Sequence, residues 1–315
     1  MKIVILNECF FLYTHINQLK SLGDLEIFED TTTEEDAINR LKDADIAIAD
    51  CLIAPLNKKV LESTNKLKFL ALNTTGYDAV DLKTADAKGI KVSNVPGFAT
   101  DSVAEHTIAL MFAVIRKIAY GDKVMRINPF QIDPGKKEEQ KFLGFNIAGK
   151  TFGVIGLGAI GQKIAELGNA LGMNVISYNR TPKEIANVTM VSLEELLKNS
   201  DVVSINLQLT PETEYIIGEK ELNLMKPSAI IINTARGKHI DSKALYNALS
   251  SGKIAGAGLD VIEDWTKDNP LLKLDNVVFT PHEGFFTKES LKNLSDIILK
   301  NVESFVNVNP INLVS

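Results

Sequence analysis

The sequence predicts an α/β protein made of two doubly wound domains, each built on a parallel sheet. Short apolar runs alternate with amphipathic segments along most of its 315 residues. Strands separated by helices form βαβ units, and their right-handed crossovers build parallel sheets. The length corresponds to about two domains of ordinary size. A hydrophobic content of 45% with 23% charged residues is typical of a globular chain with a large core.

The net charge indicates which large partners to exclude. With 34 lysines and arginines against 40 acidic residues, the chain carries a charge of −6. Such a surface repels polyanions, so we expect no nucleic-acid partner and no membrane partner. The sequence also lacks the apolar region of a signal peptide and any apolar run near the roughly 20 residues that span a bilayer. We therefore expect a cytoplasmic protein in which Cys9 and Cys51 are reduced thiols.

The first part of the chain predicts the smaller domain. Amphipathic segments such as Glu34–Leu41 and Ala54–Glu62 predict helices between short buried strands. The predicted strands are Lys2–Leu6, Ile46–Ala49, Phe69–Leu72 and Ile90–Val92.

A change of pattern follows Pro96-Gly97. The capping box Ser102-Val103-Ala104-Glu105 predicts a helix that begins here and runs to about Tyr120. This helix is apolar on nearly every side, so we expect it to be buried between domains or between subunits. The polar, Gly- and Pro-containing segment Arg126–Asn146 predicts an irregular excursion.

A second alternation of strands and helices begins at Thr151, and the chain closes with a long amphipathic helix from Lys288 to Val306. The predicted strands are Thr151–Ile155, Asn174–Tyr178, Val202–Leu207, Ala229–Asn233, Gly256–Val261 and Val277–Thr280.

The most specific local motif is Gly156-Leu157-Gly158-Ala159-Ile160-Gly161. It follows a predicted strand and opens a predicted helix, which is the context of a dinucleotide-binding turn. In that turn the first glycine makes the bend, the second lets the pyrophosphate approach, and the third lets helix and strand pack closely. The motif predicts a Rossmann-type domain with an anion site at the helix N-terminus. A plain βα turn is the alternative.

The end of the next strand bears on the cofactor. Dinucleotide-binding domains that use NAD place an acid there to hold the ribose hydroxyls. Here the strand runs into Asn179-Arg180-Thr181, without a carboxylate. Because a guanidinium can bind a 2′-phosphate, the segment favours NADP over NAD. A solvated Arg180 with NAD still accepted is the other interpretation.

Three further segments follow predicted strands of the same domain: Asn233-Thr234-Ala235-Arg236-Gly237, Gly258-Leu259-Asp260-Val261 and Thr280-Pro281-His282-Glu283-Gly284. Ligands of α/β sheets gather at the carboxyl ends of the strands. Arg236 and His282 therefore put a fixed cation and a titratable imidazole near one crevice, which suits hydride chemistry on a carbonyl acid. No His, Cys and Asp cluster has the spacing of a metal site.

With these motifs the chain resembles the NAD(P)-dependent D-2-hydroxyacid dehydrogenases over nearly its whole length. The resemblance also rests on Thr75-Gly76-Tyr77-Asp78 and on Asn94-Val95-Pro96-Gly97 with the following Ser102–Thr107. The Asn-Arg-Thr run is closer to glyoxylate/hydroxypyruvate reductases, and Phe285-Phe286 is similar to D-lactate dehydrogenases.

The resemblance implies a domain organisation. Residues 1–100 and 285–315 would form a discontinuous, flavodoxin-like substrate domain, and residues 101–284 the cofactor domain, with the active site in the cleft between them. It also implies a homodimer, with the helix after Pro96-Gly97 and the excursion that follows it near the interface.

The resemblance further implies a role for each site residue. Arg236 would bind the substrate carboxylate and polarise the keto oxygen, while the amides of Gly76 and Tyr77 hold the other carboxylate oxygen. His282 would donate the proton as the hydride arrives at C2, which agrees with general acid catalysis. The cofactor would contact Val103, Gly156, Gly158, Ala159, Ile160, Gly161, Asn179, Arg180, Thr181, Thr234, Ala235 and Asp260.

One departure from the family pattern concerns the partner of His282. The family has a glutamate five residues after the aspartate that corresponds to Asp260, and here Trp265 stands at that position. We expect Glu263 to supply the carboxylate, with Asp264 as the alternative. Of the remaining histidines, His15 lies in an early polar segment. His106 is expected to be a satisfied packing residue, and His239 is expected to face solvent.

These observations favour a D-specific 2-hydroxyacid dehydrogenase that reduces a small 2-oxo acid such as glyoxylate, hydroxypyruvate or pyruvate. A phosphoglycerate dehydrogenase-type substrate is disfavoured because the loop Asp50–Pro55 has no Arg or Lys to meet a phosphate. A nucleotide-sensing corepressor or binding module on the same fold is the alternative from a different class, although it has no need of Arg236 and His282. An S-adenosylmethionine enzyme fits less well, given Gly161.

Overall fold

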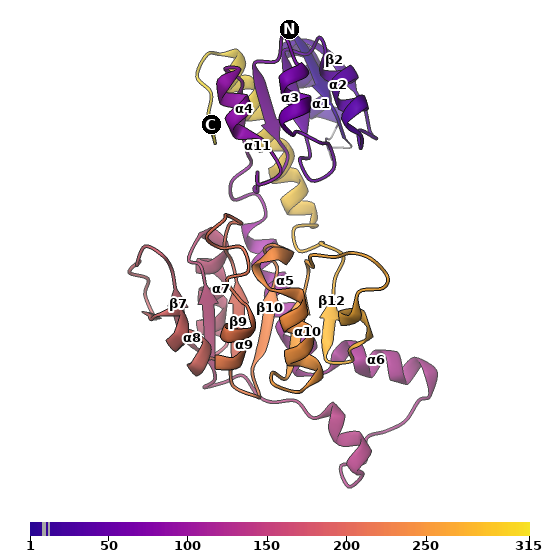
Figure 1. Ribbon diagram of the computed structural model, residues 1–315, viewed down its shortest axis with the longest axis vertical. Coiled ribbons are helices and arrows are strands. Elements are labelled where there is room, and N and C mark those ends of the chain that lie inside the picture. Colours follow the sequence, from indigo (N-terminus) through magenta and orange to yellow (C-terminus); the bar gives the residue numbers. More distant parts are fainter. Residues whose placement is uncertain (8–10, 12) are drawn as a thin grey trace. The chain divides into compact units, whose positions relative to one another are not determined.

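The computed structural model describes residues 1–7, 11 and 13–315, so Cys9 lies outside the described residues. The chain forms two compact units. We call residues Met1–Ala99 with Phe286–Ser315 the terminal unit, and Thr100–Phe285 the central unit. Figure 1 shows that both chain ends belong to the terminal unit. Within the described part of the chain, no helix is both long and apolar enough to span a membrane.

The terminal unit is a five-stranded parallel sheet in the order β2-β1-β3-β4-β5. This order is that of flavodoxin-like folds. The strands are β1 (Lys2–Ile5), β2 (Asp24–Ile27), β3 (Ile46–Ala49), β4 (Phe69–Leu72) and β5 (Lys91–Ser93), and the helices are α1 (Tyr13–Leu22), α2 (Glu34–Leu41), α3 (Lys58–Ser63), α4 (Leu82–Ala87) and α11 (Lys288–Val306).

Helix α11 returns the end of the chain to this sheet. Its residues Leu294, Ile298 and Val302 are buried on one stripe, as an amphipathic helix requires. The ring of Phe305 stacks on Phe69 of β4 with the centroids 4.5 Å apart. The discontinuous unit is therefore closed by contacts between the two ends of the sequence.

The central unit is a seven-stranded parallel sheet in the order β12-β11-β10-β9-β6-β7-β8. Counted from β6, this is the Rossmann order 3-2-1-4-5-6 with one added strand. The strands are β6 (Thr151–Ile155), β7 (Asn174–Tyr178), β8 (Val188–Met190), β9 (Val202–Ile205), β10 (Ile230–Asn233), β11 (Gly256–Leu259) and β12 (Val277–Phe279). The helices are α5 (Thr100–Ile115), α6 (Ile118–Ile127), α7 (Ala159–Ala170), α8 (Leu193–Asn199), α9 (Glu219–Leu224) and α10 (Ser242–Ser250), with the short 3-10 turns η1 (Lys137–Phe142), η2 (Gly237–His239) and η3 (Pro270–Lys273).

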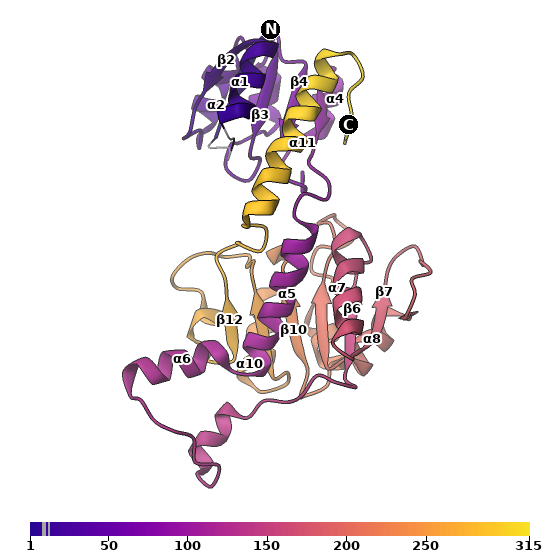
Figure 2. The same cartoon turned by 180° about the vertical axis from the view of Figure 1, so that it is seen from behind.

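The helices cover both faces of this sheet. Helices α8, α9 and α10 pack on one face (Figure 1), and α5 and α7 on the other (Figure 2). The core strands are buried along their whole length. They read as continuous apolar runs because both faces are covered.

Helix α5 corrects two expectations. It begins at Thr100, so Ser102 is a buried residue inside the helix rather than its cap. It ends at Ile115, because Lys117 adopts a left-handed backbone conformation with φ 54° before α6 starts. Its apolar faces are buried against the sheet of its own unit, where a Cβ on Gly258 would lie 3.1 Å from Leu110 Cβ. Close packing on the sheet of its own unit therefore buries one side of α5, and burial between domains or subunits stays a prediction.

Two strands were not predicted from the sequence. Strands β2 and β8 are the outermost strands of their sheets, and their residues are mostly exposed or half-buried. Since one side of an edge strand faces water, its sequence lacks the continuous apolar run that marked the central strands.

Candidate functional site

The carboxyl ends of the central strands bring most of the predicted site residues to one edge of the sheet. All seven strands are parallel, so the segments that follow them emerge on the same side. These segments carry Gly156 after β6, Asn179 after β7, Asn206 after β9, Arg236 after β10, Asp260 after β11 and His282 after β12.

The glycine turn after β6 fits a dinucleotide. Gly156 has φ 93°, a conformation that side chains rarely adopt. A Cβ on Gly161 would lie 1.9 Å from the Gly156 carbonyl oxygen, so only glycine fits there. A Cβ on Gly158, by contrast, would meet nothing within 4 Å. The open space at Gly158, beside the first amides of α7, is where a pyrophosphate can approach the backbone.

The end of β7 adds polar groups to this turn. The Asn179 Oδ1 accepts a hydrogen bond of 3.1 Å from the Leu157 amide. The Lys183 ammonium donates to the Leu157 carbonyl at 2.8 Å. Arg180 is exposed on the same loop. Lys183 was missed in the sequence, although its position three residues after Arg180 on a loop next to an anion site was a usable signal.

The turn after β10 holds the Arg236 backbone firmly. The Asn233 side chain donates to the Arg236 carbonyl at 2.8 Å and accepts from the Ala235 amide at 3.0 Å. A Cβ on Gly237 would lie 2.3 Å from the Ile262 carbonyl carbon, so this turn packs directly on the segment after β11. The hydroxyl of Thr234 is hydrogen-bonded to that of Thr107 on α5 at 2.9 Å.

Asp260 organises the turn that carries His282. Its side chain is buried and accepts from the Thr280 hydroxyl at 2.6 Å and from the Glu283 and Gly284 amides at 2.9 and 3.0 Å. The His106 Nε2 completes the cluster, 2.9 Å from Thr280 Oγ1 and 3.4 Å from Asp260 Oδ1. His106 is therefore satisfied, as expected. His282 lies inside this turn with φ 59°.

The cluster keeps Asp260 ionised. Burial alone raises the pKa of a carboxyl group. The hydrogen bonds from His106, Thr280 and the two amides outweigh this effect and hold the pKa of Asp260 at about 2. A buried carboxylate that is fully bonded therefore fixes the 280–284 turn.

Replacing Asp260 with asparagine is expected to make stability less sensitive to acid. The pKa is lower in the folded chain than in the unfolded chain, so the stabilisation is complete above about pH 4 and is lost as the pH falls towards 2. A shift of this size corresponds to about 2 kcal/mol. Urea unfolding at pH 5 and pH 2.5 should show the gap between wild type and D260N shrinking by that order. D275N, at an exposed site, is the control, and a constant gap would contradict the prediction.

The two candidate partners of His282 are both bound locally. One Glu263 oxygen accepts a short hydrogen bond from the Tyr215 hydroxyl, and the other lies 3.3 Å from Ser242 Oγ. The hydrogen bond to Glu263 raises the pKa of Tyr215 to about 12. Asp264 instead accepts from the amide and hydroxyl of Thr266, both at 2.9 Å. The role of either carboxylate toward His282 stays a prediction.

His239 was wrongly expected to face solvent. It is fully buried, and both ring nitrogens lie within hydrogen-bond distance of backbone carbonyl oxygens. Within the turn η2, Lys238 is exposed and the next residue, His239, is buried.

In the terminal unit, the Gly76–Tyr77 loop follows β4. The Thr74 hydroxyl donates to the Gly76 carbonyl at 2.7 Å, and the buried thiol of Cys51 lies 3.5 Å from the same oxygen. The Thr75 hydroxyl donates to the Val95 carbonyl at 3.0 Å. The contacts to the Gly76 carbonyl hold the peptide between Gly76 and Tyr77, whose N–H is the Tyr77 amide that the resemblance assigns to the substrate carboxylate.

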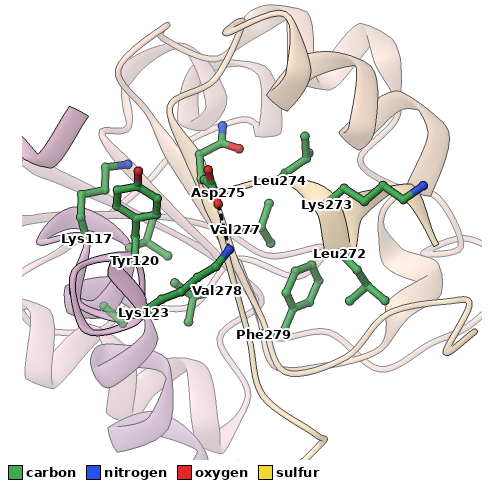
Figure 3. A pocket seen from close by; sticks show the side chains of 14 residues that line it. Lys117, Tyr120, Lys123, Leu272, Lys273, Leu274, Asp275, Val277, Val278 and Phe279 are labelled. Carbon is green, nitrogen blue, oxygen red and sulfur yellow. Dashed lines mark hydrogen bonds and ion pairs between the residues drawn. The ribbon is translucent and has the colours of Figure 1, made fainter. Parts of the chain in front are cut away.

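A hollow of about 250 Å³ lies elsewhere in the central unit, beside the outermost strand β12. Figure 3 shows Lys117, Tyr120 and Lys123 on one side and Leu272 and Lys273 on the other, and Lys123 reaches Asp275 at 3.5 Å. Burial lowers the pKa of Lys117. The residues that line the hollow also include Val277, Val278 and Phe279 of β12. This hollow contains none of the predicted site residues.

The fold and the glycine turn define the class of protein. A parallel sheet in Rossmann order, with a turn shaped for a pyrophosphate, is typical of a dinucleotide-binding domain. The family model for the NAD-binding domain of D-isomer-specific 2-hydroxyacid dehydrogenases matches residues 108–284. The chain belongs to this family and is an NAD(P)-dependent oxidoreductase with a Rossmann cofactor domain and a second α/β domain.

Similar proteins with known activities support this assignment. A glyoxylate reductase of Thermococcus litoralis is 38% identical over 92% of this chain and 89% of its own. A D-3-phosphoglycerate dehydrogenase of Methanocaldococcus jannaschii is 40% identical over 91% of this chain and 54% of its own. A solved acyclic imino acid reductase in complex with NADPH and D-arginine is 39% identical, covers both chains fully and superposes with a TM-score of 0.93.

Proposed function

We propose that the chain reduces the keto group of a small 2-oxo acid of the glyoxylate, hydroxypyruvate or pyruvate class to the D-2-hydroxy acid. The observation that carries this proposal is that Arg236 and His282 lie on the segments that follow β10 and β12, both at the carboxyl edge of a cofactor-binding sheet. The 38% sequence identity to a glyoxylate reductase over 92% of this chain supports the substrate class.

The cofactor fits the turn after β6, where Gly158 leaves open space and α7 offers its first amides. When bound, a reduced nicotinamide supplies the hydride that is added to C2. We propose NADP as the preferred form, because Arg180 and Lys183 are two cations on the loop after β7 that can meet a 2′-phosphate. NADPH in a similar solved structure agrees with this assignment.

The residues of the chain act on the oxygen atoms of the substrate, namely its carboxylate and its keto oxygen. Arg236 binds the carboxylate and stabilises the charge that develops on the keto oxygen. The amides of Gly76 and Tyr77 hold the other carboxylate oxygen. His282 gives its proton to the C2 oxygen during reduction and takes one back during oxidation. Glu263, our proposed partner of His282, has to exchange its contacts with Tyr215 and Ser242 to play this role.

One substrate panel tests the proposal. Oxidation of NADPH and of NADH is followed with glyoxylate, hydroxypyruvate, pyruvate and the oxidised form of 3-phosphoglycerate. We expect the highest kcat/KM with an unphosphorylated acid and NADPH, and R180Q should lower the NADPH-to-NADH preference by about tenfold, the loss of one charged pair. A preference for NADH contradicts the NADP assignment. No oxidation with any acid favours the nucleotide-sensing module instead.

A second candidate substrate class follows from the missing glutamate. Trp265 stands where the family carries the carboxylate that charges its histidine, and it is exposed. A protonated imine already carries its proton on nitrogen, so hydride addition at its C2 depends less on a charged acid. The similar acyclic imino acid reductase favours this class. Adding methylamine to the pyruvate assay tests it: faster NADPH oxidation and an N-methyl amino acid product support imine reduction.

We also propose that the chain forms a homodimer through the segment 118–146. Ile127 and Leu143 on this segment are 77% and 78% exposed, an unusual exposure for large apolar side chains. Ile118, Met125 and Ile132 of the same segment are exposed as well. Light scattering should give the mass of two chains.

A further inference from the structure

His239 makes a contact that the proposed chemistry does not use. Its Nδ1 lies 3.1 Å from the Thr213 carbonyl oxygen and its Nε2 lies 3.0 Å from the Leu207 carbonyl oxygen. The side chain is fully buried. Carbonyl oxygens only accept, so a neutral ring donates to one of them at a time and a protonated ring to both. Both acceptors belong to one loop, residues 206–217, which follows β9.

The far end of this loop is attached to the η2 turn by backbone bonds as well. The Tyr215 amide donates to the Lys238 carbonyl at 2.7 Å, and the Ile217 amide donates to the His239 carbonyl at 3.1 Å. These bonds are independent of the imidazole. The ring of His239 extends the attachment to Leu207, at the beginning of the loop.

The beginning of the loop touches the glycine turn. A Cβ on Gly156 would lie 2.5 Å from the Asn206 carbonyl oxygen and 2.8 Å from Leu207 Cδ2. Strands β6 and β9 are neighbours in the sheet, and the strand order reverses between them. Ligands of doubly wound sheets bind at this reversal. Asn206 and Leu207 are therefore beside the turn that is proposed to hold the cofactor.

We infer that His239 is a positioning residue, which ties the Leu207 wall of the cofactor site to the turn that presents Arg236. Arg236 lies three residues before His239 and caps the same η2 turn. The imidazole thus fixes the position of Leu207, beside the dinucleotide turn, relative to Arg236, which is proposed to bind the substrate. This inference rests on the proposed function only in that the turn after β6 holds a dinucleotide.

Cofactor binding tests the inference without turnover. H239L keeps a similar volume but has no donor, H239Q keeps one donor, and L245A is the control, because Leu245 is a buried core residue of α10. Losing the bond to a buried carbonyl typically costs about 1.4 kcal/mol, so the loop should adopt its cofactor-binding conformation about tenfold less often and the apparent Kd should rise accordingly. We expect the NADPH Kd, measured by fluorescence, to rise by that factor in H239L, to recover partly in H239Q, and to remain at the wild-type value in L245A.

The two proposals fail in different ways. Wild-type chain that binds NADPH but reduces no 2-oxo acid contradicts the proposed function and leaves the His239 measurement intact. If H239L and L245A lose a similar amount of Tm and bind NADPH with the same Kd, His239 is only a packing residue. That result overturns the inference. Wild-type chain that binds neither cofactor overturns it too.

Discussion

Replacing Arg236 with lysine is expected to lower kcat/KM for the 2-oxo acid by at least about a hundredfold, the usual cost of removing one donor to a developing oxyanion. Lysine keeps the charge but loses the planar fork that binds a carboxylate through two hydrogen bonds. The backbone of the turn should be unchanged, because Asn233 holds the carbonyl of residue 236 rather than its side chain. Steady-state kinetics with the best acid of the panel measure the effect.

The neighbouring lysine provides a matched control for this variant. Lys238 is exposed and pairs with Glu214 at 3.1 Å. Exposed pairs contribute little, so K238Q should keep kcat/KM within about twofold. The NADPH Kd of R236K should also stay near the wild-type value. A kcat/KM of R236K close to wild type would show that another group binds the carboxylate.

Replacing His282 with asparagine should lower kcat for 2-oxo acid reduction by about 10²- to 10⁴-fold, the typical contribution of a general acid. Asparagine is a suitable replacement because residue 282 has φ 59°, a conformation that asparagine tolerates better than most residues. The pH profile of kcat should lose the limb that reports the imidazole. Stopped-flow measurement of NADPH oxidation gives both quantities.

The control for H282N lies in the same turn. Glu283 binds Asp260 through its backbone amide, so E283Q keeps that contact and should keep kcat within about twofold, as for an exposed side chain. H282N within tenfold of wild type would contradict the proton-donor role. If H282N reduces the pyruvate–methylamine imine much better than pyruvate, the hypothesis of imine reduction gains support, because a protonated imine needs no proton donor.

The sequence predicted the central parts of the fold well. Strands β3, β4 and β6 have the predicted ends, because strands buried on both faces are mostly continuous apolar runs. Strand β7 also has the predicted ends, although its buried residues alternate with exposed or half-buried ones. The glycine turn was equally clear, since Gly156 and Gly161 answer local steric demands and Gly158 leaves open space between them, at a fixed spacing. The start of α5 was wrong because Ser102 matched the capping pattern, while the sheet buried it inside the helix.

The class of fold, the cofactor turn and the order of the site segments along the chain therefore follow from local patterns in the sequence. Which of these residues support one another depends on the tertiary structure. Asp260 meets His106 and Thr280, and His239 meets Leu207, across long separations in sequence. Periodicity and turn motifs report the neighbours of a residue along the chain. Contacts between strand ends depend instead on the order in which the crossovers place the strands, which no local pattern contains.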